Sequence, residues 1–595
     1  MRSVDNGSRA GSLSARTRPQ RPRALAHLGS GGPARGTGSG GRAGQPARGT
    51  GGRCTTYPGS VPFRLLAAAL GGLCLWLAFP GVDLWALAPV GVALLALATA
   101  GTGPGTGFLA GAVGGFTWFL PLFEWSGTYA GVGAWFALAV ASALYPGAMG
   151  ALLGSLQREG TVRPLVVALA WVAMELARAL TPFGGFPWGR VGFSQADSPL
   201  LGAAALVGTP GLGFLVALIG ALLALALQRS AGTRGAVGSA TGSGTGVRGR
   251  TGAEGSLARV AGPAGLALAL LLAPLLVPRS VDGEPLRVAA VQANLPPGYT
   301  WDRMPPAGTV LARYTDQTHE LADRVSSGEL EQPELVVWPE SSVDVDPVNG
   351  RNAGAVTAEI MGAVDAVGAP VLAGGTVREG GRPSNTMLLY APGEGLVDSY
   401  VKVYLAPFGE FMPLREVLRH VHPLVDVVRE FNRGTEVGLV EHVGPERTLD
   451  LGVAICFEVV VDPAVRDSVL AGAEVLVVPT NNAWFGVSHE AVQQLGASRV
   501  KAVETGRAVV HSSNIGVSAL VMPDGSAQQQ TGLWTQDLVV GEVPLRTGLT
   551  PAVRLGPWPE WAAVAALAAL TAHTGWRRRR DRLAAPSPST TEVPV

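Results

Sequence analysis

The stretch Leu451-Gly452-Val453-Ala454-Ile455-Cys456-Phe457-Glu458 begins as an apolar run and ends on a cysteine and a glutamate. A short continuous apolar run is typical of a strand that is buried on both faces. Similar runs occur elsewhere between residues 284 and 548, at 286–292, 334–338, 370–374 and 474–479. Helical stretches lie between them, at about 308–325 and 356–367. The pattern predicts an α/β domain in which helices cover sheets.

Two further stretches carry a reactive group where a predicted strand ends. Val337-Trp338-Pro339-Glu340 ends on a carboxylate, and Tyr400-Val401-Lys402 ends on a lysine. Catalytic groups in open α/β sheets tend to lie at strand ends. Together with Cys456 they fit acyl transfer, in which Glu340 takes the thiol proton and the Lys402 ammonium stabilises the thiolate and the oxyanion. We also expect a lysine beside the cysteine to lower the pKa of the thiol.

Composition points to the same lysine and cysteine. Among 45 Lys and Arg residues, lysine occurs only at Lys402 and Lys501, which suggests places where a guanidinium does not serve. Cysteine occurs at Cys54, Cys74 and Cys456, and only Cys456 lies in the predicted α/β domain. These cysteines are far apart, so they indicate neither a disulfide framework nor a metal site. Nothing in the sequence requires a metal or an organic cofactor.

Long apolar runs lie outside the α/β domain. A helix needs about 20 apolar residues to cross the hydrocarbon core of a bilayer. Runs of roughly this length lie near residues 61–80, 84–101, 106–126, 131–154, 163–181, 200–228, 260–278 and 558–574. The sequence therefore predicts a multi-span α-helical membrane domain with about eight spans, in addition to the α/β domain.

Arginine-rich segments set the orientation of these spans. The N-terminal segment is rich in Gly, Ser and Arg, and Arg577-Arg578-Arg579-Arg580 follows the last apolar run. Positive charge favours the cytoplasmic side of a membrane, so both ends are predicted to be cytoplasmic. The predicted parts are a disordered tail, a seven-span domain, an extracytoplasmic catalytic domain, a final span and a second cytoplasmic tail, at residues 1–57, 58–283, 284–548, 549–576 and 577–595.

The order of the motifs resembles the nitrilase superfamily. The matching stretches are Trp338-Pro339-Glu340, Tyr400-Val401-Lys402, Leu405-Ala406-Pro407-Phe408-Gly409-Glu410, Cys456-Phe457-Glu458 and Asn481-Asn482-Ala483-Trp484-Phe485-Gly486. Within it, roughly residues 60–590 resemble the apolipoprotein N-acyltransferase family, and Phe186-Pro187-Trp188 matches as well. The resemblance implies seven spans, an extracytoplasmic αββα nitrilase-like sandwich and an eighth span.

The resemblance also implies roles for individual residues. Glu340 would be the general base, Lys402 the stabiliser of the oxyanion and thiolate, and Cys456 the nucleophile. Glu410 and Glu458 correspond to further essential carboxylates, which position Lys402 and the loops of the active site.

Two positions depart from the family's pattern. Phe457 stands where the family usually has Tyr, and Asn482 stands where it usually has Asp. Trp301 matches a family tryptophan near the substrate, so Trp301 and Phe457 are predicted to take part in substrate binding. Lys501 and Glu504, three residues apart on a predicted helix, are expected to form a structural charge pair.

The resemblance further implies the substrates. A membrane phospholipid would donate the acyl chain, and the α-amine of the diacylglyceryl cysteine of an apolipoprotein would accept it after a thioester intermediate. We expect a monomeric enzyme in the cell membrane, and a net charge of +1 argues against nucleic acid as a partner. Two alternatives are a membrane-tethered amidase or nitrilase-type hydrolase, which leaves the spans unexplained, and a transporter or scaffold with an inactive enzyme domain.

Overall fold

The computed structural model describes residues 59–238, 251–296, 305–420, 423–426, 428–444 and 447–584 of the 595-residue chain. All of these residues belong to one compact unit. The predicted tail at 1–57, most of the tail at 577–595, and Trp301 lie outside the described residues.

Each of the eight apolar runs contains a helix. These helices are α1 (Val61–Leu77), α2 (Leu87–Thr99), α3 (Pro104–Leu122), α4 (Glu124–Leu156), α5 (Pro164–Leu180), α6 (Ala204–Gly238), α7 (Thr251–Leu272) and α14 (Trp558–Ala584). Three described stretches, Pro104–Leu122, Glu124–Leu156 and Leu201–Ala231, are long and apolar enough to cross a membrane by length and composition. The helical region is therefore confirmed, whereas the count of eight spans stays a prediction.

Glycine allows α1, α3 and α4 to approach one another at backbone distance. A Cβ atom on Gly72 of α1 would lie 2.0 Å from the carbonyl oxygen of Gly114 in α3. One on Gly107 of α3 would lie 2.3 Å from the carbonyl oxygen of Gly150 in α4. Any larger residue would push these helices apart, which gives the glycines of the apolar runs a packing function.

The α/β part contains two six-stranded sheets, with strand orders β12-β1-β2-β3-β4-β5 and β11-β10-β9-β8-β7-β6. The first is built from β1 (Glu284–Gln292), β2 (Leu335–Val337), β3 (Val371–Glu379), β4 (Arg382–Ala391), β5 (Gly395–Val401) and β12 (Asp537–Leu545). The second is built from β6 (Leu439–Val443), β7 (Thr448–Val453), β8 (Val475–Thr480), β9 (Val509–Ser513), β10 (Ala519–Val521) and β11 (Ala527–Gln528). The central strands β1-β2-β3 and β7-β8-β9 run parallel, so their carboxyl ends meet at one edge of each sheet.

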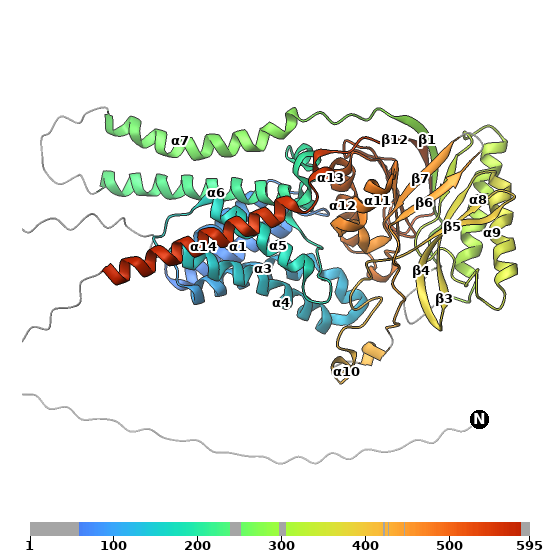
Figure 1. Ribbon diagram of the computed structural model, residues 1–595, viewed down its shortest axis with the longest axis horizontal. Coiled ribbons are helices and arrows are strands. Elements are labelled where there is room, and N and C mark those ends of the chain that lie inside the picture. Colours follow the sequence, from blue (N-terminus) through green and yellow to red (C-terminus); the bar gives the residue numbers. More distant parts are fainter. Residues whose placement is uncertain are drawn as a thin grey trace, which may run out of the picture. The chain divides into compact units, whose positions relative to one another are not determined.

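Helices cover the outer face of each sheet. Figure 1 shows α8 (Thr309–Ser326) and α9 (Ala353–Val367) on one side of the strands, and α11 (Asp462–Ala471) and α12 (Glu490–Thr505) on the other. One apolar core lies between the two sheets, a second joins the first sheet to α8 and α9, and a third joins the second sheet to α11 and α12. The predicted αββα sandwich is therefore confirmed.

A buried ion cluster joins the helices to the α/β layers. Arg190, in the loop after α5, lies 2.7 Å from Asp462 of α11 and 3.2 Å from Glu560 of α14. Lys501 pairs with Asp462 and lies 3.0 Å from Glu504. We call these five residues the Lys501 cluster. The charge pair predicted for Lys501 and Glu504 is present, as part of a larger network.

Candidate active site

The site is built around the turn that follows β7. The strand predicted to reach Cys456 ends earlier, at Val453, and Cys456 begins the short helix η5 (Cys456–Val460). The backbone of Cys456 has a φ of +53°, in the left-handed region that residues other than glycine rarely adopt, so the chain turns sharply there. The hydroxyl of Thr480 lies 3.4 Å from the Cys456 sulfur, and the amide Nε2 of Gln494 lies 3.6 Å from it.

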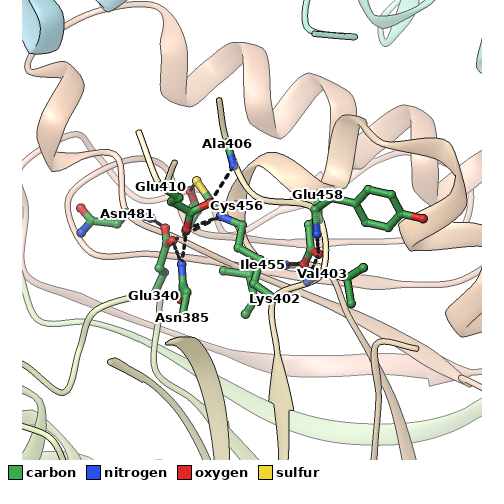
Figure 2. Close-up of polar contacts among 12 residues, drawn as sticks. Glu340, Asn385, Lys402, Val403, Ala406, Glu410, Ile455, Cys456, Glu458 and Asn481 are labelled. Atoms are coloured by element: carbon green, nitrogen blue, oxygen red, sulfur yellow. Dashed lines mark hydrogen bonds and ion pairs between the residues drawn. The ribbon is translucent and has the colours of Figure 1, made fainter. Parts of the chain in front are cut away.

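Lys402 follows β5 and points into the same space. Its side chain is only 1% exposed, and Nζ donates a hydrogen bond to Oε1 of Glu410 at 3.0 Å. The same Nζ lies 3.7 Å from Oε1 of Glu340. Asn385 of β4 bridges the carboxylates, because its Nδ2 donates to Glu340 at 2.6 Å and to Glu410 at 2.8 Å (Figure 2).

Glu340 lies just after β2 and is held from two sides. Besides the bond from Asn385, its Oε2 accepts a hydrogen bond from the backbone N–H of Asn481 at 2.9 Å. The next residue, Ser341, has a φ of +63°, so the chain reverses immediately after the carboxylate. The fold therefore brings together three motifs that lie far apart in the sequence.

The other two predicted carboxylates hold the backbone of the site. Oε2 of Glu410 accepts the N–H of Ala406 at 2.7 Å. Glu458 is fully buried and accepts hydrogen bonds from the backbone N–H groups of Val403 and Ile455, both at 2.9 Å. Glu458 thus ties the segment after Lys402 to the residue before Cys456, whereas Glu410 contacts the lysine directly.

Charges around the thiol explain its protonation state. Burial alone would lower the pKa of Lys402, but Glu410 and Glu340 raise it above its ordinary value, so the ammonium is firmly charged. Burial and the charge of Glu340 raise the pKa of Cys456, and Lys402 offsets only part of that shift. Lys402 lowers the pKa of the thiol, as the sequence predicts, but burial and Glu340 outweigh it. The net shift favours the protonated sulfur, which would need a base before it could act as a nucleophile.

Phe457 lies where the α/β part, called the catalytic layer below, meets the apolar helices and the loop after α5. Its ring stacks on Phe186 with centroids 5.7 Å apart. Trp188, two residues further on, donates from Nε1 to the side-chain oxygen of Gln493 at 2.9 Å, and so anchors the same loop to α12. The Phe186-Pro187-Trp188 motif is therefore part of the wall around the site.

A cavity of about 560 Å³ borders Phe457. Its walls come from the end of α5, the loop after α5, the segment after Lys402 and the start of α14, and include Phe183, Leu405, Phe411 and Trp561. Arg190 and Arg466 also line it. This volume is within the usual range for a ligand pocket, and most of the lining is apolar.

Sequence reasoning missed two amide side chains and one hydroxyl side chain of the site. Asn385, Gln494 and Thr480 contact the catalytic candidates, yet no motif marked them. Asn385 lies between Ser384 and Thr386 in the polar half of β4, so the sequence alone does not mark it. Among the described residues, no group of three or more His, Cys, Asp or Glu side chains could hold a metal ion.

Comparisons with known proteins match both parts of the chain. Residues 71–222 match the family model described as the apolipoprotein N-acyltransferase N-terminal domain, and residues 287–549 match carbon-nitrogen hydrolase. The apolipoprotein N-acyltransferase of Mycolicibacterium smegmatis is 34% identical over 83% of this chain and 82% of its own length. That of Azotobacter vinelandii is 32% identical over 90% of this chain and 99% of its own length. The chain belongs to the apolipoprotein N-acyltransferase family.

As a member of the apolipoprotein N-acyltransferase family, the chain is an acyltransferase with a nitrilase-type catalytic domain. The family is a bacterial membrane enzyme that N-acylates lipoproteins, in keeping with the apolar helices. Among solved structures, a mutant of the Nesterenkonia AN1 amidase from the nitrilase superfamily aligns with a TM-score of 0.35 at 18% identity, over 47% of this chain and 96% of the amidase.

Proposed function

We propose that this chain moves an acyl chain from a membrane phospholipid to the α-amine of the N-terminal S-diacylglyceryl cysteine of apolipoproteins, through a thioester on Cys456. One observation carries the proposal: the Cys456 thiol, the Lys402 ammonium and the Glu340 carboxylate meet in one buried site, where Lys402 and Glu340 both influence the thiol. The identity of the acceptor substrate is inferred from the family to which the chain belongs.

In the first half-reaction Glu340 takes the proton of the Cys456 thiol. The thiolate attacks the ester carbonyl of the phospholipid, and the Lys402 ammonium stabilises the oxyanion that forms. The carbon–oxygen ester bond breaks, and the leaving alkoxide takes the proton from Glu340. Lysophospholipid departs and the acyl chain stays on the sulfur. Because burial and Glu340 raise the pKa of the thiol, a base is needed in this step.

In the second half-reaction the α-amine of the apolipoprotein attacks the thioester. The amine gives a proton to Glu340, the carbon–sulfur bond breaks, and the thiolate takes the proton back. Glu410 keeps the ammonium of Lys402 in place through its 3.0 Å hydrogen bond. Glu458 holds the segment after Lys402 next to the residue that precedes Cys456. Neither carboxylate needs to touch the substrate.

The apolar cavity beside Phe457 supports a lipid donor. A volume of about 560 Å³ with mostly apolar walls suits an acyl chain. A hydrolase of small amides would use the same three groups but would have no use for such a cavity. We propose that Phe457, and Trp301 outside the described residues, contact the lipid substrates.

The proposal includes a location in the membrane. Seven spans within 58–283 and one within 549–576 would hold residues 284–548 on the extracytoplasmic side, as a monomer in the bilayer. Arg351 is exposed on the α/β part, and Arg582 is exposed near the end of α14. In intact cells, an impermeant maleimide should label an Arg351→Cys variant and should leave Arg582→Cys unlabelled. The reverse labelling pattern would refute this orientation.

The mechanism is tested with the purified chain and phospholipid alone. Mass spectrometry should find one acyl chain on Cys456, removable by neutral hydroxylamine, together with released lysophospholipid. Cys456→Ala should carry no acyl chain and release no lysophospholipid, and the control Cys74→Ala, altered within α1, should behave as wild type. If Cys456→Ala acylates the acceptor at a normal rate, or if lysophospholipid appears only after acceptor is added, the covalent mechanism is wrong.

A further inference from the structure

A buried polar network lies behind the sulfur of Cys456 and takes no part in the steps above. Its members come from β8, the segment after it, α12 and β9, and each is at most 1% exposed: Thr480, Asn482, Glu490, Gln494 and Ser513. We call it the Glu490 network. A fully buried carboxyl in such a place needs an explanation, because burying it costs free energy.

The hydrogen bonds of the Glu490 network form a series of donors and acceptors that fixes the orientation of the Asn482 amide. The backbone N–H of Gly516 donates to Oγ of Ser513 at 2.7 Å, and the Ser513 hydroxyl donates to Oδ1 of Asn482 at 2.5 Å. With its oxygen held in this way, Asn482 turns its amide nitrogen the other way. Nδ2 of Asn482 donates to Oε2 of Glu490 at 2.7 Å and to Oε1 of Gln494 at 2.8 Å.

The orientation of Gln494 follows from the same bonds. Its Oε1 accepts from Asn482 and also from the hydroxyl of Thr480 at 2.7 Å. A reversed amide would set two NH₂ groups against each other, so the network selects one orientation. In that orientation the Nε2 donor of Gln494 lies 3.6 Å from the sulfur of Cys456.

We propose that Glu490 is a positioning residue that holds Asn482, and through it Gln494, so that an amide N–H faces the sulfur of Cys456. The inference deepens the proposed function and rests on Cys456 being the nucleophile. A hydrogen bond to a charged acceptor is stronger than one to a neutral acceptor, so this N–H stabilises the thiolate relative to the thiol. While it is uncharged, Glu490 acts on the sulfur through Asn482 and Gln494.

The charge of Glu490 adds a pH dependence. Burial raises the pKa of Glu490 to about 8, the bond from Asn482 opposes this, and the negative charge of Glu340 adds to it. The titratable groups that face Glu490 are Glu340, from the end of β2, and Cys456, from η5. At neutral pH Glu490 is therefore uncharged. Above about pH 8 it ionises, and its negative charge then raises the pKa of the thiol and opposes thiolate formation.

The test measures how fast iodoacetamide alkylates Cys456 in the purified full-length chain as pH rises, by mass spectrometry of the peptide that carries Cys456. Glu490→Gln keeps the shape and the acceptor oxygen, so alkylation should equal wild type at neutral pH and exceed it above about pH 8. Glu490→Ala and Gln494→Leu should both slow alkylation at neutral pH by about tenfold, because losing the bond raises the thiol pKa by about one unit. Glu359→Gln, on the exposed face of α9, is the charge-matched control and should leave the profile unchanged.

Three results would overturn the proposal: normal alkylation in Glu490→Ala, equal losses in Glu490→Gln and Glu490→Ala, or coinciding profiles of wild type and Glu490→Gln above pH 8. The nearly isosteric Gln variant decides the question even if Glu490→Ala does not fold. Alkylation needs no acyl donor. A chain that alkylates as expected but forms no thioester from phospholipid would therefore count against the proposed function and leave the role of Glu490 intact.

Discussion

The two lysines of this chain lie in two buried ion clusters of similar composition. Each lysine is 1% exposed, and each ammonium lies between two carboxylates. Lys402, however, has a cysteine beside it, and among the described residues its ammonium donates one hydrogen bond, to Glu410. We therefore expect the remaining N–H groups of Lys402 to be available to a developing negative charge.

Among the described residues, the ammonium of Lys501 uses two of its three N–H groups, against one for Lys402. The Lys501 ammonium bonds to Asp462 and Glu504, and a second cation, Arg190, shares Asp462 and also reaches Glu560. These side chains come from α11, α12, the loop after α5, and α14, so the cluster holds the catalytic layer against the helices. Similar ion pairs thus lie beside the candidate nucleophile in one place and between the helices and the α/β part in the other.

Among the substitutions that distinguish the two ion clusters, Lys402→Arg is expected to have the largest effect. Acyl-enzyme formation should fall by at least about 10³-fold, because the preorganised donor is lost and a planar guanidinium does not fit between Glu340 and Glu410. The thioester on Cys456 is quantified by mass spectrometry, and a thermal melt checks folding. Lys501→Arg is the matched control and should lose far less activity. Equal losses in the two variants would erase the distinction.

A smaller effect, on stability, is expected for Lys501→Met. Glu504 would then lose its ion pair and Asp462 would keep the one with Arg190, and breaking a buried ion cluster in this way should lower the free energy of unfolding by about 3 kcal/mol. Unfolding in detergent, followed by intrinsic fluorescence, measures the change, and thioester formation per folded molecule should stay normal. Arg324→Met breaks a pair that is 35% and 59% exposed and should cost below about 1 kcal/mol. A loss of thioester at unchanged stability would assign Lys501 to catalysis.

The smallest effect is expected where the helices contact the Lys501 cluster through one hydroxyl. Thr209 of α6 donates to Oε2 of Glu504 at 2.6 Å, and Thr209→Val removes that bond while keeping the shape. The free energy of unfolding should fall by about 1 kcal/mol, with no change in activity. In the control Thr574→Val, the lost bond is to the helix's own backbone at Leu570, and stability should barely change. If both variants melt alike, the contact at Glu504 contributes nothing to docking.

The fold could largely be predicted from sequence because its signals are local. Continuous apolar runs predicted β1, β2, β3, β7 and β8, and the long runs predicted the helices. The end of β7 was misplaced, since an apolar run does not reveal that the backbone of Cys456 adopts a positive φ. Scarcity of lysine alone pointed equally to Lys402 and Lys501; only the motifs around Lys402 separated them.

The rest of the site could not be predicted because it depends on long-range contacts. Asn385 meets Glu340 across 45 positions of the chain, and Gln494 meets Cys456 across 38. Neither residue type is rare, so neither stands out in composition. The direction of the thiol pKa shift was also inaccessible, because it depends on how much burial and Glu340 outweigh Lys402.

The bond between Arg190 and Glu560 joins a loop that is synthesised early to a helix that is synthesised almost last. In a nascent chain that has not yet reached α14, or in a truncated one, Arg190 keeps its ion pair with Asp462 but lacks the one with Glu560. Such a chain buries a cation with one partner missing, which weakens the docking of its catalytic layer. The order of synthesis therefore has a physical consequence: Arg190 gains both of its ion pairs only once α14 has packed against the rest of the fold.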